Sequence, residues 1–177
     1  MDQALTRARS LIREIQDYPN PGIRFLDLTP LLADGPSFHS IISTLAPLAK
    51  NCDVVAGIEA RGFIFAAALA HSLNLGFVPI RKRGKLPYLT HEESYGLEYG
   101  NDVVQIHQDA IAEGARALLV DDVLATGGTA SAGIRLIQRS GGIVVGVSAV
   151  IEIDVLQARS RLSQDFPTVP VHTIFTM

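Results

Sequence analysis

Cysteine is nearly absent from this sequence, since Cys52 is the only one among 177 residues. A single cysteine excludes an intramolecular disulfide framework and a zinc site built on cysteines, and it is typical of a protein in the reducing cytoplasm. We interpret Cys52 as a structural or incidental residue rather than a nucleophile. The five histidines show no spacing typical of metal ligands, so we name no residue of the chain as a metal ligand.

Charge is also scarce, with 19% charged residues and a net charge of −3. This balance argues against a general binder of nucleic acid or of membrane surfaces. Residues 1–13 contain no long apolar run, so we expect neither a signal peptide nor a membrane span there. By contrast, 47% of the residues are hydrophobic, which argues against disorder. The length suits a single domain.

Strand-like apolar runs alternate with helical patterns along the chain. The predicted helices are residues 2–17, 37–50 (capped by Ser37), 63–73, 130–139 and 152–162. The predicted strands are residues 53–58, 75–80, 103–106, 117–120, 143–151 and 169–175, of which 103–106 is expected to be antiparallel. Residues 23–32 are expected to be irregular or extended, and residues 86–94 to form a mobile segment without regular structure. The alternation predicts an α/β fold with a mostly parallel, doubly wound sheet.

An acidic pair and a loop rich in glycine and threonine adjoin the 117–120 strand. Asp121 and Asp122 end this predicted strand, and residues 126–129 (Thr-Gly-Gly-Thr) open the next helix. Carboxylates at the end of a parallel strand project into the crevice where open α/β sheets bind ligands. The helix N-terminus beside them suits an anion. Acids beside an anion-binding loop indicate a ligand that carries both hydroxyls and a phosphate. The loop is neither a Walker loop, which has a lysine after the glycines, nor a dinucleotide fingerprint, which is Gly-x-Gly-x-x-Gly.

Cations follow two other predicted strands. Arg61 comes shortly after the strand of residues 53–58, and residues 81–85 place four cations after the strand of residues 75–80. Such residues are often solvated or in surface ion pairs that contribute little to stability. At the same sheet edge as the acidic pair, however, they could neutralise a phosphate or pyrophosphate.

Residues 120–129 resemble the phosphoribosyl-pyrophosphate motif of the type I phosphoribosyltransferases. Four further stretches, in order over nearly the whole chain, resemble the adenine phosphoribosyltransferase family: residues 17–25, 59–63, 81–87 and 95–100. The resemblance implies the type I phosphoribosyltransferase fold. It implies a single domain with a small N-terminal hood (about residues 1–35), a core (about 36–177) and a flexible lid loop (about 82–99).

The resemblance also implies an activity in purine salvage. The expected reaction transfers the 5-phosphoribosyl group from phosphoribosyl pyrophosphate to adenine, giving AMP and pyrophosphate through an oxocarbenium-like transition state. Mg²⁺ would be held mainly through substrate oxygens, and the protein would be a cytoplasmic homodimer without nucleic-acid or membrane partners. Two alternatives stay open, namely transfer to xanthine or hypoxanthine, and a non-catalytic sensor of phosphoribosyl pyrophosphate. Such a sensor should carry a DNA-binding module or a basic surface, and we find neither in these 177 residues.

Roles for individual residues follow from the resemblance alone. Asp121 and Asp122 would bind the ribose hydroxyls. The 5′-phosphate would be bound by Ala125, Thr126, Gly127, Gly128 and Thr129. The pyrophosphate would be bound by Arg61 and Lys85, with Arg81 reaching into the active site of a neighbouring subunit. Lys82 would also belong to the substrate-binding residues.

The base site is implied in the same way. Phe25 would stack on adenine, the backbone of Ile23 and Leu26 would bond its edge, and Leu156 would close its other face. Glu98, as the proton handler, would be catalytic together with Arg61 and Tyr99. The sequence departs from the family pattern at Leu26, where arginine is common, and at Ala158, where glycine is often found.

Overall fold

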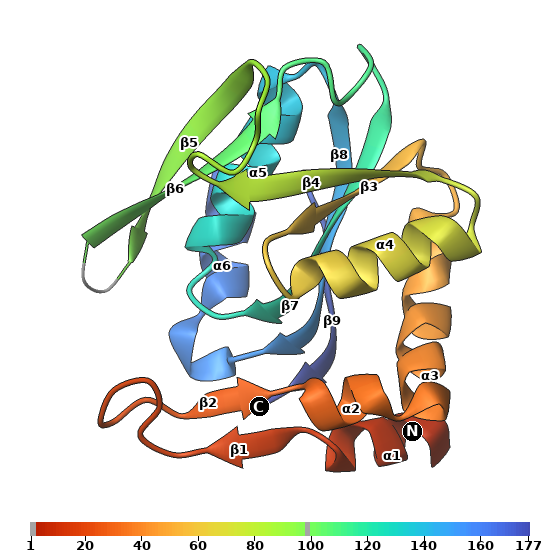
Figure 1. Ribbon diagram of the computed structural model, residues 1–177, viewed down its shortest axis with the longest axis vertical. Helices are drawn as coiled ribbons and strands as arrows, with labels where there is room; N and C mark the ends of the chain where they lie inside the picture. Colours follow the sequence, from red (N-terminus) through yellow and green to blue (C-terminus); the bar gives the residue numbers. More distant parts are fainter. Residues whose placement is uncertain (1–2, 98–99) are drawn as a thin grey trace. The chain divides into compact units, whose positions relative to one another are not determined.

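The computed structural model describes residues 3–97 and 100–177, and the chain divides into two compact units, Met1–Thr44 and Leu45–Met177 (Figure 1). The first unit contains a two-stranded sheet and short helices. The second contains the large sheet that the sequence predicts.

The first unit begins with helix α1 (Gln3–Ser10), followed by strands β1 (Arg13–Ile15) and β2 (Phe25–Asp27). The prediction of one helix over residues 2–17 is therefore wrong beyond Ser10. Strand β1 pairs antiparallel with β2, and the Arg13 Nη2 atom lies 2.7 Å from Asp27 Oδ2 across the pair. Cross-strand pairing outweighs the helical spacing of the apolar residues in this segment.

Helices α2 (Thr29–Ala33) and α3 (Gly35–Leu45) complete the first unit, and α3 leads into the 3₁₀ helix η1 (Ala46–Ala49). The expected cap, Ser37, lies inside α3 instead. Its backbone N–H donates to Asp34 Oδ1 at 3.0 Å, so the residue that caps the helix is Asp34. Asp34 also pairs with Arg7 of α1, which lowers the pKa of this carboxyl well below its usual value.

Seven strands form the sheet of the second unit, in the order β5-β6-β4-β3-β7-β8-β9. They are β3 (Val54–Ile58), β4 (Gly76–Lys82), β5 (Thr90–Leu97), β6 (Gly100–His107), β7 (Arg116–Leu124), β8 (Ile143–Glu152) and β9 (Val171–Thr176). Strands β4, β3, β7, β8 and β9 are parallel, whereas β6 is antiparallel to both β4 and β5. The mostly parallel sheet and its antiparallel strand are confirmed.

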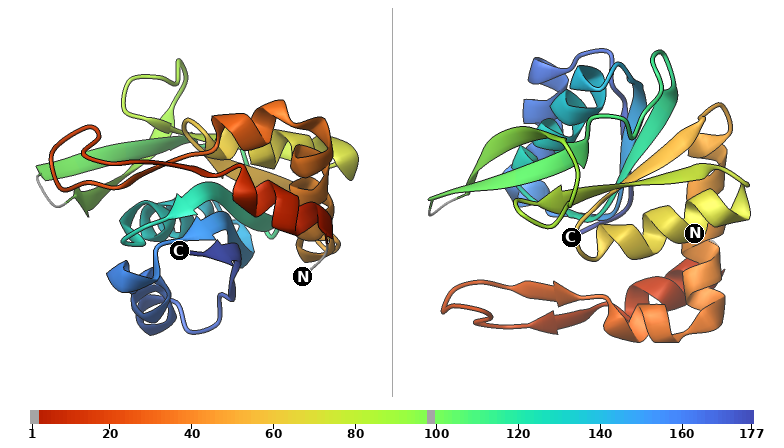
Figure 2. Two further views of the ribbon diagram at one scale, coloured as in Figure 1. Left: turned by 90° about the horizontal axis from the view of Figure 1, so that it is seen from below. Right: turned by 45° about the horizontal axis from the view of Figure 1, so that its top comes forward.

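The helices of this unit are α4 (Gly62–Ser72), α5 (Gly128–Arg139), the 3₁₀ helix η2 (Asp154–Leu156) and α6 (Ala158–Asp165). The crossover β3–α4–β4 leads along the sheet in one direction, and β7–α5–β8 leads in the other. Because such crossovers are right-handed, α4 and α5 cover opposite faces of the sheet (Figure 2). The direction in which successive strands are added therefore reverses between the parallel strands β3 and β7. Doubly wound sheets bind ligands at such a switch point.

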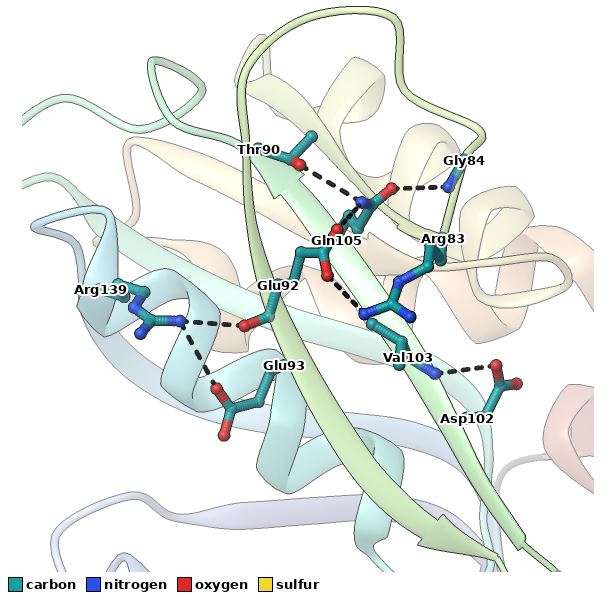
Figure 3. A network of polar contacts seen from close by, with 9 residues as sticks. All are labelled: Arg83, Gly84, Thr90, Glu92, Glu93, Asp102, Val103, Gln105 and Arg139. Carbon is teal, nitrogen blue, oxygen red and sulfur yellow. Dashed lines mark hydrogen bonds and ion pairs between the residues drawn. The ribbon is translucent and has the colours of Figure 1, made fainter.

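Two segments of the second unit differ from expectation. Strand β7 runs through the acidic pair to Leu124, because it stays paired with β8 as far as Glu152. The segment of residues 86–94 was expected to lack regular structure, yet β5 begins at Thr90 and pairs with β6 residue by residue. The buried side chain of Gln105, which is 6% exposed, donates from its amide to Thr90 and Glu92 (Figure 3).

Among the described residues, no helix is long and apolar enough to cross a membrane.

Gly62 begins α4 at a point of very close approach to β7. A Cβ atom there would lie 2.8 Å from Asp121 Oδ1 and 3.1 Å from the backbone oxygen of Val120. Because such overlap forces backbone shifts, we expect Gly62→Ala to lower the free energy of unfolding by about 1–3 kcal/mol.

Urea denaturation measures this loss, and Gly35→Ala is the matched control. Gly35 also begins a helix, α3, and a Cβ there would meet nothing within 4 Å. The control should cost less than about 0.5 kcal/mol. Equal losses in both variants would contradict the account of the close approach.

Candidate functional site

Parallel strands β3 and β7 bring a cation and two acids together at the switch point. They pair as far as Gly57 and Val120, so the segments that follow these residues leave the sheet side by side. Arg61 lies directly before α4, and Asp122 lies in the last third of β7. The Arg61 Nε atom is 2.7 Å from Asp122 Oδ2. The structure thus places these two predicted site residues in direct contact.

The two acids have different surroundings. Asp122 is 7% exposed and is compensated by Arg61. Asp121 is partly buried, and its Oδ1 atom accepts the backbone N–H of Asp122 at 2.8 Å. Loss of hydration and the neighbouring Asp122 charge raise the pKa of Asp121 well above its usual value. A carboxyl group in this setting is better suited to hydroxyl partners than to a further negative charge.

The predicted phosphate loop connects β7 to α5. Gly127 has φ +84°, a left-handed conformation that favours glycine, and α5 begins at Gly128 with no side-chain cap. Ala158 of α6 is fully buried against this loop, and its Cβ would lie 3.4 Å from a Cβ on Gly127. The alanine that departs from the family pattern therefore packs against the loop at Gly127.

A pocket of about 260 Å³ adjoins this loop. It combines the start of α5 with part of β5 and with cations from α5 and α6. Its lining residues are Ser94, Tyr95, Gly96, Thr126, Gly127, Gly128, Ser131, Arg135, Arg161 and Asp165. The sequence analysis named the loop residues but missed Arg135 and Arg161. Arg135 lies further along α5 and Arg161 lies in α6, and only the fold shows that both line the pocket beside the loop.

The basic run after β4 is held by a carboxylate that follows β3. Glu59 Oε1 and Oε2 accept from the Arg81 guanidinium at 2.9 and 3.1 Å, and Oε2 accepts the backbone N–H of Lys82 at 3.0 Å. The hydrogen bond from Arg81 is the largest influence that lowers the pKa of Glu59. Arg81 also donates to the backbone oxygen of Lys85, so its guanidinium is engaged within its own chain.

Asp102 of β6 connects the basic run to β5. Its Oδ2 atom lies 2.9 Å from Lys82 Nζ and accepts the Tyr95 hydroxyl at 3.1 Å. The hydrogen bond from Lys82 is the largest influence that lowers the pKa of Asp102. The sequence analysis did not single out Asp102. The strand expected there began only at Val103, whereas β6 begins at Gly100 and pairs Asp102 with Tyr95.

The predicted base-binding residues belong to both units. In the first unit, Phe25 is partly buried and its ring meets that of Tyr18 edge to face at 5.1 Å between centroids. Leu26 is only 3% exposed, whereas Ile23 is 39% exposed. In the second unit, Leu156 ends η2 and is partly buried. Glu98 and Tyr99 lie outside the described residues.

The donor atoms at the switch point suit a hard cation only in part. Within residues 3–97 and 100–177, no three His, Cys, Asp or Glu side chains converge in a way that could hold a metal ion. The Asp121 and Asp122 carboxylates do supply oxygen atoms, which Mg²⁺ prefers. Such an ion would take most of its other ligands from a substrate and from water.

Replacing Asp121 by asparagine should stabilise the protein at neutral pH. Because the folded-state pKa of this acid is raised, the unfolded chain releases the proton first, and stability falls as pH rises above the ordinary value of about 3.9. Asparagine carries no such penalty and keeps the acceptor for the Asp122 N–H. We expect the melting temperature at pH 8 to rise by about 2–4 °C. The gain should shrink towards pH 4.5, and a gain that grows on acidification would contradict the assignment.

Residues 38–171 match the model of the phosphoribosyl transferase domain. The adenine phosphoribosyltransferase of Parvibaculum lavamentivorans is 53% identical over 156 residues, which cover 87% of this chain and 89% of that protein.

Solved structures of the same kind superpose closely. The adenine phosphoribosyltransferase of Rhodothermus marinus has a TM-score of 0.91 at 49% identity, with 98% of each chain covered. That of Saccharomyces cerevisiae, solved with an imino-altritol bisphosphate and adenine, has a TM-score of 0.90 at 32% identity, covering 98% of this chain and 99% of that one. The chain therefore belongs to the phosphoribosyltransferases, in the adenine phosphoribosyltransferase family.

Proposed function

We propose that this chain transfers the 5-phosphoribosyl group of phosphoribosyl pyrophosphate to adenine, forming AMP and pyrophosphate in purine salvage. The contact between Arg61 and Asp122, beside the loop that opens α5, is the observation that supports this best. It combines a group that binds hydroxyls with a group that binds phosphate, and phosphoribosyl pyrophosphate carries both. Adenine is proposed as the acceptor base because the similar proteins are adenine phosphoribosyltransferases.

The donor half of the site follows from charge and hydrogen bonding. Asp121 and Asp122 bind the 2′ and 3′ hydroxyls of the ribose, and Ala125–Thr129 bind the 5′-phosphate. The uncapped start of the twelve-residue helix α5 supports the second role, since its first N–H groups favour an anion.

The chemical difficulty of the reaction is charge separation. The ribose carbon becomes cation-like while pyrophosphate departs with additional negative charge. Arg61, Lys82 and Lys85 stabilise this departing charge, because cations placed where negative charge develops lower the energy of the transition state. Water must be kept from the same carbon, since it would compete with the base.

Mg²⁺ is the cofactor we propose, bound mainly through pyrophosphate and ribose oxygens. Asp121 and Asp122 are the protein carboxylates available to it, directly or through water. When bound, the ion supplies further positive charge to the leaving group.

Adenine is bound by residues of the first unit. Phe25 stacks on the ring, and the backbone of Ile23 and Leu26 reads its edge. The buried side chain of Leu26, 3% exposed, supports a contact made by the main chain rather than by a side chain. The loss of the family's usual arginine at this position is then tolerated. Glu98 handles the proton of the base, with Tyr99 beside it.

We further propose a homodimer in the cytoplasm. The buried lone thiol of Cys52 is consistent with a reducing compartment. Arg81 is the residue expected to reach a neighbouring active site. Because Glu59 holds its guanidinium within the chain, such a contact requires pyrophosphate oxygens to replace the Glu59 carboxylate.

The base preference tests the function. Purified protein is given phosphoribosyl pyrophosphate, Mg²⁺ and an equimolar mixture of adenine, hypoxanthine and xanthine, and the nucleotides formed are separated. AMP should be the dominant product. A preference for either 6-oxopurine would replace the proposed acceptor, and no nucleotide at all would favour a sensor without catalysis.

Two substitutions should separate the two substrates. Phe25→Ala should raise the KM for adenine about tenfold or more, since stacking on a base contributes roughly 1–3 kcal/mol. Asp122→Asn should raise the KM for phosphoribosyl pyrophosphate by about tenfold, because an amide N–H₂ donor replaces one carboxylate oxygen that accepts from a hydroxyl and the ion pair that positions Arg61 is lost. Steady-state kinetics with each substrate varied in turn measures both. Equal effects of either variant on the two KM values would count against the assignment.

A further inference from the structure

We propose that Asp102 is a positioning residue of the donor site, which fixes Lys82 and Tyr95 so that phosphoribosyl pyrophosphate meets them already ordered. The inference rests on the proposed function. It concerns a residue that neither touches the substrate in that proposal nor belongs to any of the motifs in the sequence.

Asp102 of β6 joins the two neighbouring strands β4 and β5. One carboxylate oxygen, Oδ2, serves both the Lys82 ammonium at 2.9 Å and the Tyr95 hydroxyl at 3.1 Å. The other, Oδ1, accepts the backbone N–H of Val103 at 2.8 Å, which fixes the orientation of the carboxylate. Both donors are therefore directed to one point at the edge of the sheet.

Tyr95 carries this constraint to the phosphate loop. Its Cδ2 atom would lie 3.5 Å from a Cβ on Gly128, and the backbone oxygen of Gly96 would lie 3.3 Å from it. Burial is the largest influence on the pKa of Tyr95 and raises it, whereas a hydrogen bond with the Thr129 side chain lowers it. The ring thus lies against the first residues of α5, and Asp102 holds its hydroxyl end.

Lys82 carries the constraint to the pyrophosphate side. It ends β4, its backbone N–H is bound by Glu59, and its side chain is 57% exposed. A lysine side chain has large rotamer freedom, and binding is weakened by the cost of ordering it. Because Asp102 orders the Lys82 ammonium before the substrate binds, the entropy lost in ordering it does not weaken binding. A purely competitive role would have the opposite effect, since Asp102 would then withhold Lys82 from pyrophosphate.

The other end of the hairpin provides a matched comparison. Glu92 of β5 also pairs with a cation of the basic run, Arg83, at 2.6 Å, and it also accepts from the β6 residue Gln105 (Figure 3). Its backbone oxygen is bound by Arg139 of α5. Glu92 thus makes the same kinds of contact as Asp102, but its partners include neither Lys82 nor Tyr95.

The test compares Asp102→Asn with Glu92→Gln. Binding of phosphoribosyl pyrophosphate with Mg²⁺ is measured by titration calorimetry, and AMP formation by steady-state kinetics. Asp102→Asn should weaken donor binding and raise the donor KM about tenfold, the usual effect of lost hydrogen bonds to a charged group. The KM for adenine should change less than about twofold, as should both KM values of Glu92→Gln.

A double-mutant cycle identifies the route of the effect. Tyr95→Phe removes only the hydroxyl and should raise the donor KM several-fold. Combined with Asp102→Asn it should add less than about twofold, because the two groups act as one unit. Additive effects would overturn the proposal, and so would tighter donor binding by Asp102→Asn or equal losses in Glu92→Gln.

Failure of the function itself gives a different result. In that case the wild-type protein forms no AMP, or does not bind phosphoribosyl pyrophosphate, and the inference falls with it. Should Asp102→Asn not fold, as judged by its melting temperature, Tyr95→Phe decides alone. An unchanged donor KM in that variant would overturn the proposal.

Discussion

The ion pair between Arg61 and Asp122 is the constraint on which the rest of the site depends. Asp122 is 7% exposed, and a carboxylate that has lost most of its hydration must be compensated by an opposite charge. Compensation requires the segment after β3 to approach β7 very closely, and Gly62 permits this because it has no side chain. The sheet register, the glycine and the ion pair therefore form one arrangement, and a change in any of them moves Arg61 relative to the acids.

Paired charges also explain how a weakly acidic protein can hold a highly charged substrate. Arg61, Arg81 and Lys82 each contact a carboxylate of the chain, namely Asp122, Glu59 and Asp102. The site is therefore locally close to neutral, and it offers directed donors rather than an excess of positive charge. This is consistent with the net charge of −3, and it distinguishes recognition of a small phosphate ester from general binding of polyanions.

The parallel part of the sheet could be predicted from sequence because its strands contain apolar runs, and the acidic pair and the loop because they adjoin one of these runs. Strand β5 has a largely polar sequence and was not predicted. What the sequence did not indicate depends on contacts across elements. Residues 13–15 continue a helical spacing but pair with β2, and Asp34 replaces Ser37 as the cap of α3 because its carboxylate accepts the Ser37 N–H. Asp102, Arg135 and Arg161 adjoin the phosphate loop or the basic run only through the fold.

We propose above all that the ends of β3 and β7 form one site for phosphoribosyl pyrophosphate. A crystal structure of the protein with this compound and Mg²⁺ tests it most directly. We expect the 5′-phosphate within hydrogen-bond distance of the backbone N–H groups of residues 126–129, and the ribose hydroxyls on Asp121 and Asp122. Arg61 should then contact the pyrophosphate. Pyrophosphate bound in the loop of residues 126–129, with the ribose directed away from the two acids, would contradict the claim.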